Sequence, residues 1–147
     1  MDGELRVLIV DDDAPVLTSL ERGFRSFVRK ADGELVITAV RARDGKEALE
    51  QLTSSRFDIM ITDVDMPTMN GIELLKRVFN GERDHIPPII HAWTGGNHNR
   101  LQELENPANN CGAAYPHGVK EELVQRVREL ANKAIAFKES KEKQEAA

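Results

Sequence analysis

Short apolar runs alternate with amphipathic segments along most of the chain. Four runs are rich in β-branched side chains and end at polar residues, as buried parallel strands do: residues 5–10, 34–40, 58–64 and 87–93. Between them, apolar residues recur at three- and four-residue steps, which predicts helices that begin near Asp13, Asp44 and Asn70. Strands that alternate with helices predict an α/β fold, with a parallel sheet covered on both faces.

The pattern changes in the last third of the chain. It weakens between residues 97 and 110, and the sequence GAAYP at 112–116 predicts a short fifth strand at an edge. An amphipathic pattern from Lys120 to Phe137 predicts a long last helix. The tail KESKEKQEAA has no apolar partners, so we expect a solvated extension, a frayed end or the start of a linker. We therefore place one domain at residues 1–138 and a charged extension or linker at 139–147.

Length and composition limit the class of protein. A chain of 147 residues is long enough for one domain with a closed core. The formal charge of −5 and the lack of a basic block do not indicate direct binding of nucleic acid. The single cysteine, Cys111, excludes an internal disulfide and fits a reducing compartment. Neither a signal peptide nor an apolar stretch of the roughly 20 residues that span a bilayer is visible, which predicts a cytoplasmic protein.

Acidic residues follow two of the predicted strands. Asp11 and Asp12 come after the first strand, and Asp63 and Asp65 come at the end of the third. In a doubly wound sheet of order 2-1-3-4-5 these strands are neighbours, so we expect Asp11, Asp12 and Asp63 to lie close together. Carboxylates this close repel and take up protons or a cation. Oxygen ligands of this kind suit Mg²⁺, which would also neutralise an incoming phosphoryl group while one carboxylate attacks it.

A simpler interpretation competes with this one. Taken alone, an acidic triplet before a helix is usually a cap with solvated neighbours, and two aspartates in a loop are equally ordinary. Two such clusters at the ends of strands that are expected to be adjacent favour a functional site.

Four segments together resemble the receiver domain of two-component response regulators: VLIVDDD, RARDGKEALE, DIMITDVDMPTMNGIELL and GAAY…EELVQRVREL. The resemblance runs from about residue 5 to about residue 130, and DVDMPTMNG is its most specific part. It implies a flavodoxin-like (βα)5 fold in which Asp63 is the phosphoacceptor and Asp11 and Asp12 hold Mg²⁺. The backbone carbonyl of Asp65 would be a further ligand, and the Asp65 side chain would tune dephosphorylation. Gly71 would shape the turn into the third helix.

The chain departs from the family at two places. The usual spacing from the phosphoacceptor places the switch hydroxyl of strand four on Trp93, and we predict that Thr94, the next residue, supplies it. The family has a lysine after strand five, where this chain has His117. This histidine is either a cationic stand-in or a solvated loop residue, and Lys120 is expected in the first turn of the last helix. Tyr115 matches the aromatic switch position or is simply packed on an edge strand.

The leading hypothesis is a signalling switch rather than an enzyme. The resemblance implies that a sensor histidine kinase or a phosphotransfer protein supplies the phosphoryl group. Phosphorylation would alter the surface formed by the fourth helix, the fifth strand and the fifth helix. That surface would bind a partner, an output domain or a second copy of the chain. One alternative is a degenerate receiver that binds proteins without phosphorylation, as the missing lysine suggests. Another is a phosphatase of the haloacid dehalogenase class, whose Asp-x-Asp-x-Thr loop the sequence DVDMPT superficially resembles.

Overall fold

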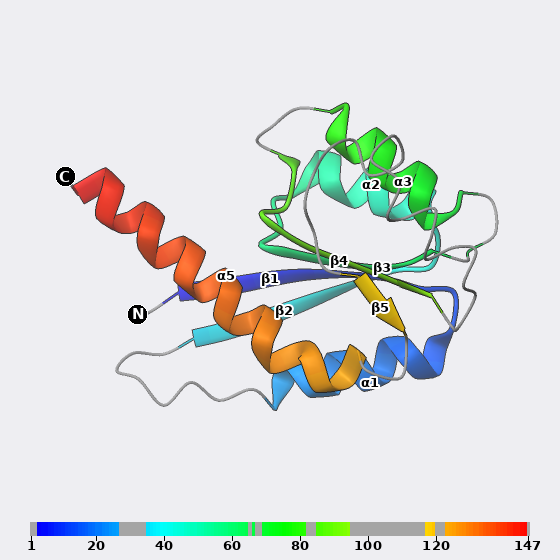
Figure 1. The fold of residues 1–147 in the computed structure, drawn as a ribbon, viewed down its shortest axis with the longest axis horizontal. Helices are drawn as coiled ribbons and strands as arrows, with labels where there is room; N and C mark the ends of the chain where they lie inside the picture. Colours follow the sequence, from blue (N-terminus) through cyan, green and yellow to red (C-terminus); the bar gives the residue numbers. More distant parts are fainter. Residues whose placement is uncertain are drawn as a thin grey trace.

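The computed structural model describes residues 3–26, 35–64, 66, 69–81, 85–94, 117–119 and 123–146. Its sheet has five parallel strands in the order β2-β1-β3-β4-β5 (Figure 1). The strands are β1 (Gly3–Val10), β2 (Leu35–Ala42), β3 (Ile59–Asp63), β4 (Ile89–Thr94) and β5 (His117–Val119). The helices of the described residues are α1 (Ala14–Arg25), α2 (Gly45–Ser54), α3 (Gly71–Phe79) and α5 (Leu123–Ala146). The predicted α/β, flavodoxin-like strand order is confirmed.

Helices cover both faces of the sheet. In Figure 1, α2 and α3 lie on one side, and α1 and α5 lie on the other. Because side chains alternate along a strand, β1 sends Leu8 and Val10 into the core under α2 and α3. It sends Val7 and Ile9 into the core under α1 and α5. Each strand of the centre is therefore buried on both faces, which is why its sequence is almost continuously apolar.

Local capping fixes where two helices begin. The Asp44 carboxylate accepts a hydrogen bond of 2.8 Å from the Glu47 N–H at the start of α2. The Asn70 side chain accepts one of 2.9 Å from the Glu73 N–H at the start of α3. Both predicted caps are confirmed, and they satisfy N–H groups that have no partner inside the helix. Asp13 occupies the N-cap position of α1, but its side chain makes no capping hydrogen bond.

The last helix is anchored at the edge of the sheet where the strands begin. Lys138 Nζ donates to the backbone carbonyl of Glu4 and lies 3.3 Å from the carboxylate of Asp58. Residues 140–145 are exposed, although the helix continues to Ala146 and projects past the sheet in Figure 1. The division of the chain at residue 138 stays a prediction. Within the described residues, no helix has the length and apolar content needed to span a membrane.

Candidate acidic cation site

The register of β1 and β3 brings two aspartates side by side. Val10 lies opposite Thr62, so Asp11 and Asp63, the next residue of each segment, follow at the same edge of the sheet. Because side chains alternate along a strand, Asp11 shares a face with Ile9, and Asp63 shares a face with Ile61. Ile9 and Ile61 pack in the core under α1 and α5. Asp11 is fully buried and Asp63 is 3% exposed. Two carboxylates are thus held in a largely water-excluded position at the carboxyl ends of neighbouring strands.

A third carboxylate completes the cluster from the solvent side. One carboxylate oxygen from each of Asp11, Asp12 and Asp63 lies within 4.8 Å of the others, and Asp12 is exposed. Hard oxygen donors at this spacing, with one side open to water, fit Mg²⁺, which retains several water ligands. The predicted convergence of these three residues is confirmed. Asp65, whose backbone carbonyl was predicted as a further ligand, lies outside the described residues.

Backbone hydrogen bonds position Asp11. Its N–H donates to the Ala42 carbonyl at the end of β2, at 3.0 Å. One of its carboxylate oxygens accepts a hydrogen bond of 2.9 Å from the Asp13 N–H. The side chain is therefore oriented by the loop that leads into α1, and Asp12, between the two, remains accessible to solvent.

The loop after β3 approaches the backbone of Asp63 closely. The Gly71 N–H donates to the Val64 carbonyl at 3.0 Å, which joins the start of α3 to the end of β3. A Cβ on Gly71 would lie 2.4 Å from the Asp63 carbonyl oxygen and 2.8 Å from the Val64 Cα. No side chain fits there, so this position requires glycine. Met66, in the same loop, is 9% exposed and packs in the core under α2 and α3.

At β4, the register places Trp93 and not Thr94 opposite Asp63. Trp93 is fully buried in the core under α1 and α5, and its carbonyl accepts a 2.9 Å hydrogen bond from the Val64 N–H. Thr94 is the last residue of β4, and its side chain lies outside the described residues. Its role as the switch hydroxyl therefore stays a prediction.

The fifth strand lies further along the chain than predicted. β5 is His117–Val119, paired with Ala92–Thr94 of β4, whereas the sequence suggested a strand at 112–116. The predicted place of His117, after the strand, is wrong, because His117 pairs with Ala92 inside the sheet. Lys120 comes next in the sequence but lies outside the described residues, so its expected place in the first turn of the last helix stays a prediction. The three-residue strand is too short and too polar for its pattern to be recognised. Tyr115 lies outside the described residues.

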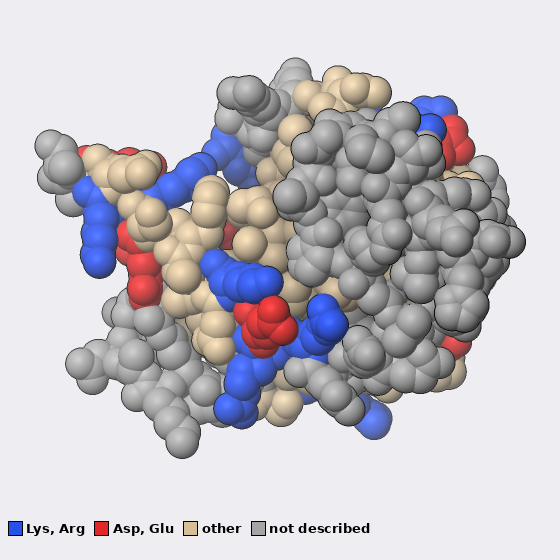
Figure 2. All heavy atoms as spheres, viewed as in Figure 1, with Lys and Arg blue, Asp and Glu red and all other residues tan. Residues whose placement is uncertain are grey.

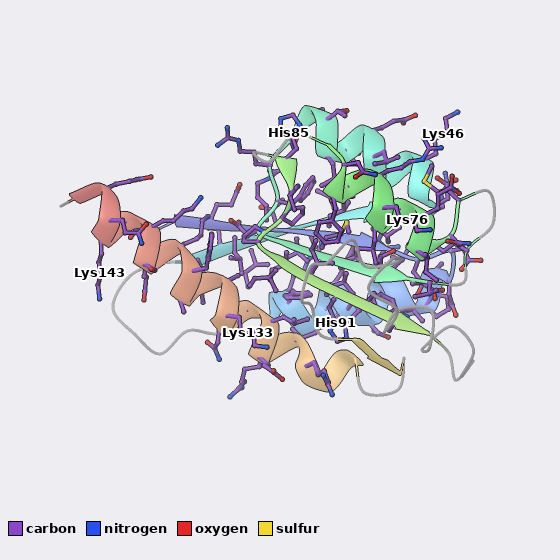
Figure 3. The ribbon with its side chains drawn as sticks, turned by 45° about the horizontal axis from the view of Figure 1, so that its top comes forward. Lys46, Lys76, His85, His91, Lys133 and Lys143 are labelled. Atoms are coloured by element: carbon purple, nitrogen blue, oxygen red, sulfur yellow. The ribbon has the colours of Figure 1, made fainter. Side chains whose placement is uncertain are left out.

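Sequence reasoning missed the burial of one polar side chain on β4, His91. His91 lies within β4 and is 1% exposed, and Figure 3 shows it at the sheet. It shares the face of Trp93 because the two are separated by one residue. The alternation within PPIIHAW was the signal that would have placed both on one face.

The resolved shifts in pKa belong to an ion pair away from the carboxylates. Arg41 of β2 donates to both carboxylate oxygens of Glu21 of α1, at 2.5 and 2.9 Å. This hydrogen bonding lowers the pKa of Glu21 and raises that of Arg41. The pair ties α1 to the edge strand and has no visible part in the cation site.

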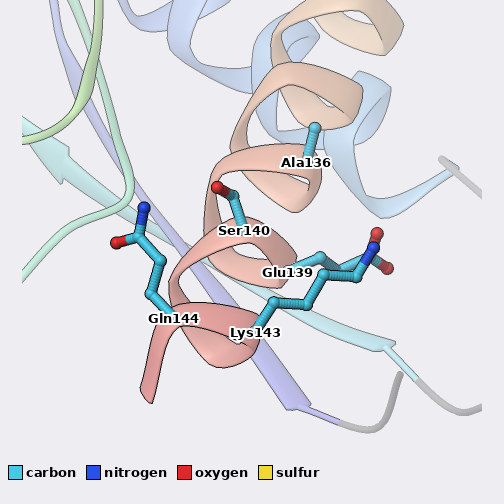
Figure 4. A pocket seen from close by; sticks show the side chains of 5 residues that line it. All are labelled: Ala136, Glu139, Ser140, Lys143 and Gln144. Atoms are coloured by element: carbon cyan, nitrogen blue, oxygen red, sulfur yellow. The ribbon is translucent and has the colours of Figure 1, made fainter. Parts of the chain in front are cut away.

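Two further surface features carry no comparable chemistry. Among the described residues on the face in Figure 2, basic and acidic side chains are intermixed over α5. A shallow groove of about 450 Å³ lies against the end of α5 and is lined by Ala136, Glu139, Ser140, Lys143 and Gln144 (Figure 4). Since Lys138 of this part of α5 contacts the beginning of β1, the groove is at the opposite edge from the carboxylates.

The chain is similar to known proteins in sequence and in fold. The model of the response regulator receiver domain family matches residues 7–111. The transcriptional regulatory protein PrrA of Mycobacterium bovis is 37% identical over 125 residues, which are 85% of this chain and 49% of PrrA. The chain thus spans about half the length of this relative.

Two solved structures are also similar to this chain. The chemotaxis protein CheY4 of Vibrio cholerae has a TM-score of 0.62 and 26% identity, over 87% of this chain and 99% of CheY4. The response regulator protein TrrA of Thermotoga maritima, solved in complex with Mg²⁺-BeF, has a TM-score of 0.60 and 25% identity. That alignment covers 86% of this chain and 98% of TrrA.

Proposed function

The chain belongs to the response regulator receiver domain family, and we propose that it is a phosphorylation switch with Asp63 as the phosphoacceptor. The observation that carries the proposal is the convergence of Asp11, Asp12 and Asp63 within 4.8 Å at the carboxyl ends of β1 and β3. A parallel sheet of this kind binds its ligand at that edge. We propose that these three carboxylates and the backbone carbonyl of Asp65 hold Mg²⁺.

The transfer uses the side chain of Asp63 as a nucleophile. One of its carboxylate oxygens forms a bond to the phosphorus of a phosphohistidine, and the P–N bond breaks with its electron pair remaining on the imidazole nitrogen. Bound Mg²⁺ supplies positive charge that offsets the charge of the phosphoryl oxygens. The burial of Asp63 supports the transfer, because few water molecules have access to compete with the phosphodonor.

We propose that three further side chains bind or respond to the phosphoryl group. We keep Thr94 as the hydroxyl that binds a phosphoryl oxygen and Tyr115 as the aromatic switch. Because β5 ends at Val119, we now propose Lys120 as the cation that binds the phosphoryl group, with His117 as the alternative. Comparing Lys120→Ala with His117→Ala decides between them, since the variant without the donor forms the shorter-lived phosphoprotein.

The proposed partners follow from the family. A sensor histidine kinase or a phosphotransfer protein supplies the phosphoryl group, and the chain acts in signalling in the cytoplasm rather than as a separate enzyme. Phosphorylation changes the surface of the fourth helix, β5 and α5, which then binds a partner, an output domain or a second copy. We do not favour the phosphatase alternative, because Asp63 ends the third strand rather than the first and the chain matches the receiver family.

The direct test is phosphorylation by a small donor. The wild-type protein is incubated with Mg²⁺ and acetyl phosphate, and intact mass spectrometry is expected to show the addition of one phosphoryl group. Asp63→Asn removes the nucleophile and should abolish the addition. Asp13→Asn is the matched control, since Asp13 lies in the same acidic loop but outside the cluster of three. A wild-type protein that takes up no phosphoryl group and binds no Mg²⁺ would support the phosphorylation-independent interaction module instead.

A further inference from the structure

Trp93 is the residue that the sheet places beside the proposed phosphoacceptor. Its Cα is the register partner of Asp63 across β3 and β4, and neighbouring strands are about 4.8 Å apart. The Val64 N–H donates to the Trp93 carbonyl at 2.9 Å, so the residue after Asp63 is also tied to Trp93. A movement of the backbone at the phosphoacceptor therefore acts directly on Trp93.

The Trp93 side chain connects this position to two helices. It is fully buried in the core cluster that lies between the sheet, α1 and α5. The members of that cluster from α5 are Val127, Leu130, Ala131 and Ala134. Directly opposed residues of parallel strands extend to the same face, so Asp63 and Trp93 share the face that α1 and α5 cover. The indole is consequently buried on the face of the sheet that carries Asp63, in the core that α5 also lines.

The indole N–H of Trp93 is a buried hydrogen-bond donor. Trp93 Nε1 is inaccessible to water and has no hydrogen-bond partner in the described part of the chain. Buried tryptophan N–H groups usually have a partner, because a buried donor without one is unfavourable. A partner that arrives only in one state of the protein would satisfy the donor in that state alone.

We infer that Trp93 is a phosphoryl-binding residue, whose indole N–H donates to an oxygen of the phosphoryl group when Asp63 carries it. The inference rests on the proposed phosphorylation of Asp63. A phosphoryl group brings new, negatively charged acceptor oxygens to the residue beside Trp93, and a donor to such an oxygen forms a stronger bond than a donor to a neutral group. The same contact moves the indole within the α5 core and so transmits the state of Asp63 to that helix.

The indole proton can be observed directly, because Trp93 is the one tryptophan of the chain. In a ¹H–¹⁵N spectrum of the full chain, its single indole cross-peak is recorded before and after addition of Mg²⁺ and beryllofluoride, a mimic of the phosphoryl group. We expect the proton to shift downfield when the adduct forms. Asp63→Asn, which forms no adduct, should show no such shift under the same conditions.

A substitution tests the energetic role of the N–H. Trp93→Phe keeps a buried aromatic ring but removes the donor, and we expect about tenfold weaker beryllofluoride binding, measured by calorimetry. Phe24→Leu is the matched control, because Phe24 is fully buried in the same cluster and has no hydrogen-bonding group. This control should lower the thermal unfolding midpoint and leave the affinity for beryllofluoride close to that of the wild type.

The possible results are distinct. If ¹⁹F spectra show the adduct while the indole cross-peak stays in place, the inference is overturned and phosphorylation of Asp63 stands. Equal losses of affinity in Trp93→Phe and Phe24→Leu would also overturn it, since the effect would then be one of core packing. If wild type forms no adduct at all, both the inference and the proposed function fail.

Discussion

Replacement of Gly71 by alanine tests whether the close approach between α3 and β3 holds the site together. Gly71 is the first residue of α3, and its N–H donates to the Val64 carbonyl. The added Cβ would lie 2.4 Å from the Asp63 carbonyl oxygen and 2.8 Å from the Val64 Cα. Both atoms belong to the backbone of buried residues, so neither can turn aside as a flexible side chain would. The loop or the strand must move.

The expected cost follows from this geometry. Overpacking of a well-packed interior costs roughly 1–3 kcal/mol, and a backbone contact this short belongs near the upper end. Alanine is a better helix former than glycine by up to about 1 kcal/mol, which offsets part of that cost. We therefore expect Gly71→Ala to lower the free energy of unfolding by about 2 kcal/mol, or the thermal midpoint by about 5 °C. Displacement of Asp63 should also weaken binding of Mg²⁺.

Gly81 supplies the matched control, because it lies just past the other end of α3. A Cβ there would meet the Val78 and Arg77 carbonyl oxygens at 3.4 and 3.5 Å, which are ordinary contacts. Gly81→Ala should thus change the free energy of unfolding by less than about 0.5 kcal/mol. Urea unfolding followed by the fluorescence of the buried Trp93 measures both variants. Equal stability of Gly71→Ala and Gly81→Ala would refute the reasoning.

Three further perturbations address the cation site, the edge strand and the last helix. Mg²⁺ at about 100 times its dissociation constant should stabilise the wild type by about 2.7 kcal/mol in thermal unfolding. Asp12→Asn should reduce this stabilisation. An equal stabilisation of the variant would exclude Asp12 as a ligand. Since Arg41 lowers the pKa of Glu21, their pair stabilises the fold above the ordinary pKa of glutamate and ceases to do so as the pH falls through the lowered value. Arg41→Gln should therefore lower the urea midpoint at pH 7, and the difference from wild type should close in strong acid; a constant difference would contradict this. Lys138→Met removes the contacts at the beginning of β1 and should lower the free energy of unfolding in urea by about 1 kcal/mol. The control Lys133→Ala breaks one exposed ion pair within α5 and should lower it by no more than about 0.5 kcal/mol. The opposite order of the two losses would show that Lys138 does not anchor the helix.

The fold was predictable because each local signal agreed with the others. Apolar runs of β-branched residues marked the four longer strands, and Asp44 and Asn70 marked the starts of α2 and α3. The alternation of strands and helices then left few topologies. The fifth strand was misplaced, since a three-residue strand with the sequence HGV carries no periodic signal. With the strand placed too early, the residue after it was taken to be His117 instead of Lys120.

The residues of the acidic site were predictable, because neighbouring strands of a parallel sheet end at the same edge. That rule predicts from the sequence that Asp11, Asp12 and Asp63 lie together. The same rule does not give the register of β4. That register decides whether Trp93 or Thr94 lies opposite Asp63. A shift of one residue changes which side chain lies opposite Asp63, and the sequence spacing allowed either.

The sequence by itself determined the alternation of strands and helices, the capping of two helices and the identity of the acidic residues, because these depend on residue type and on periodicity along the chain. Only the tertiary structure decided which atoms meet: the burial of Asp11 and Asp63, the contact of Gly71 with the Asp63 backbone, and the pairing of Trp93 with Asp63. These features depend on the packing of segments that are distant along the chain. Their energies are set by distances of a few ångströms, and no local pattern encodes those distances.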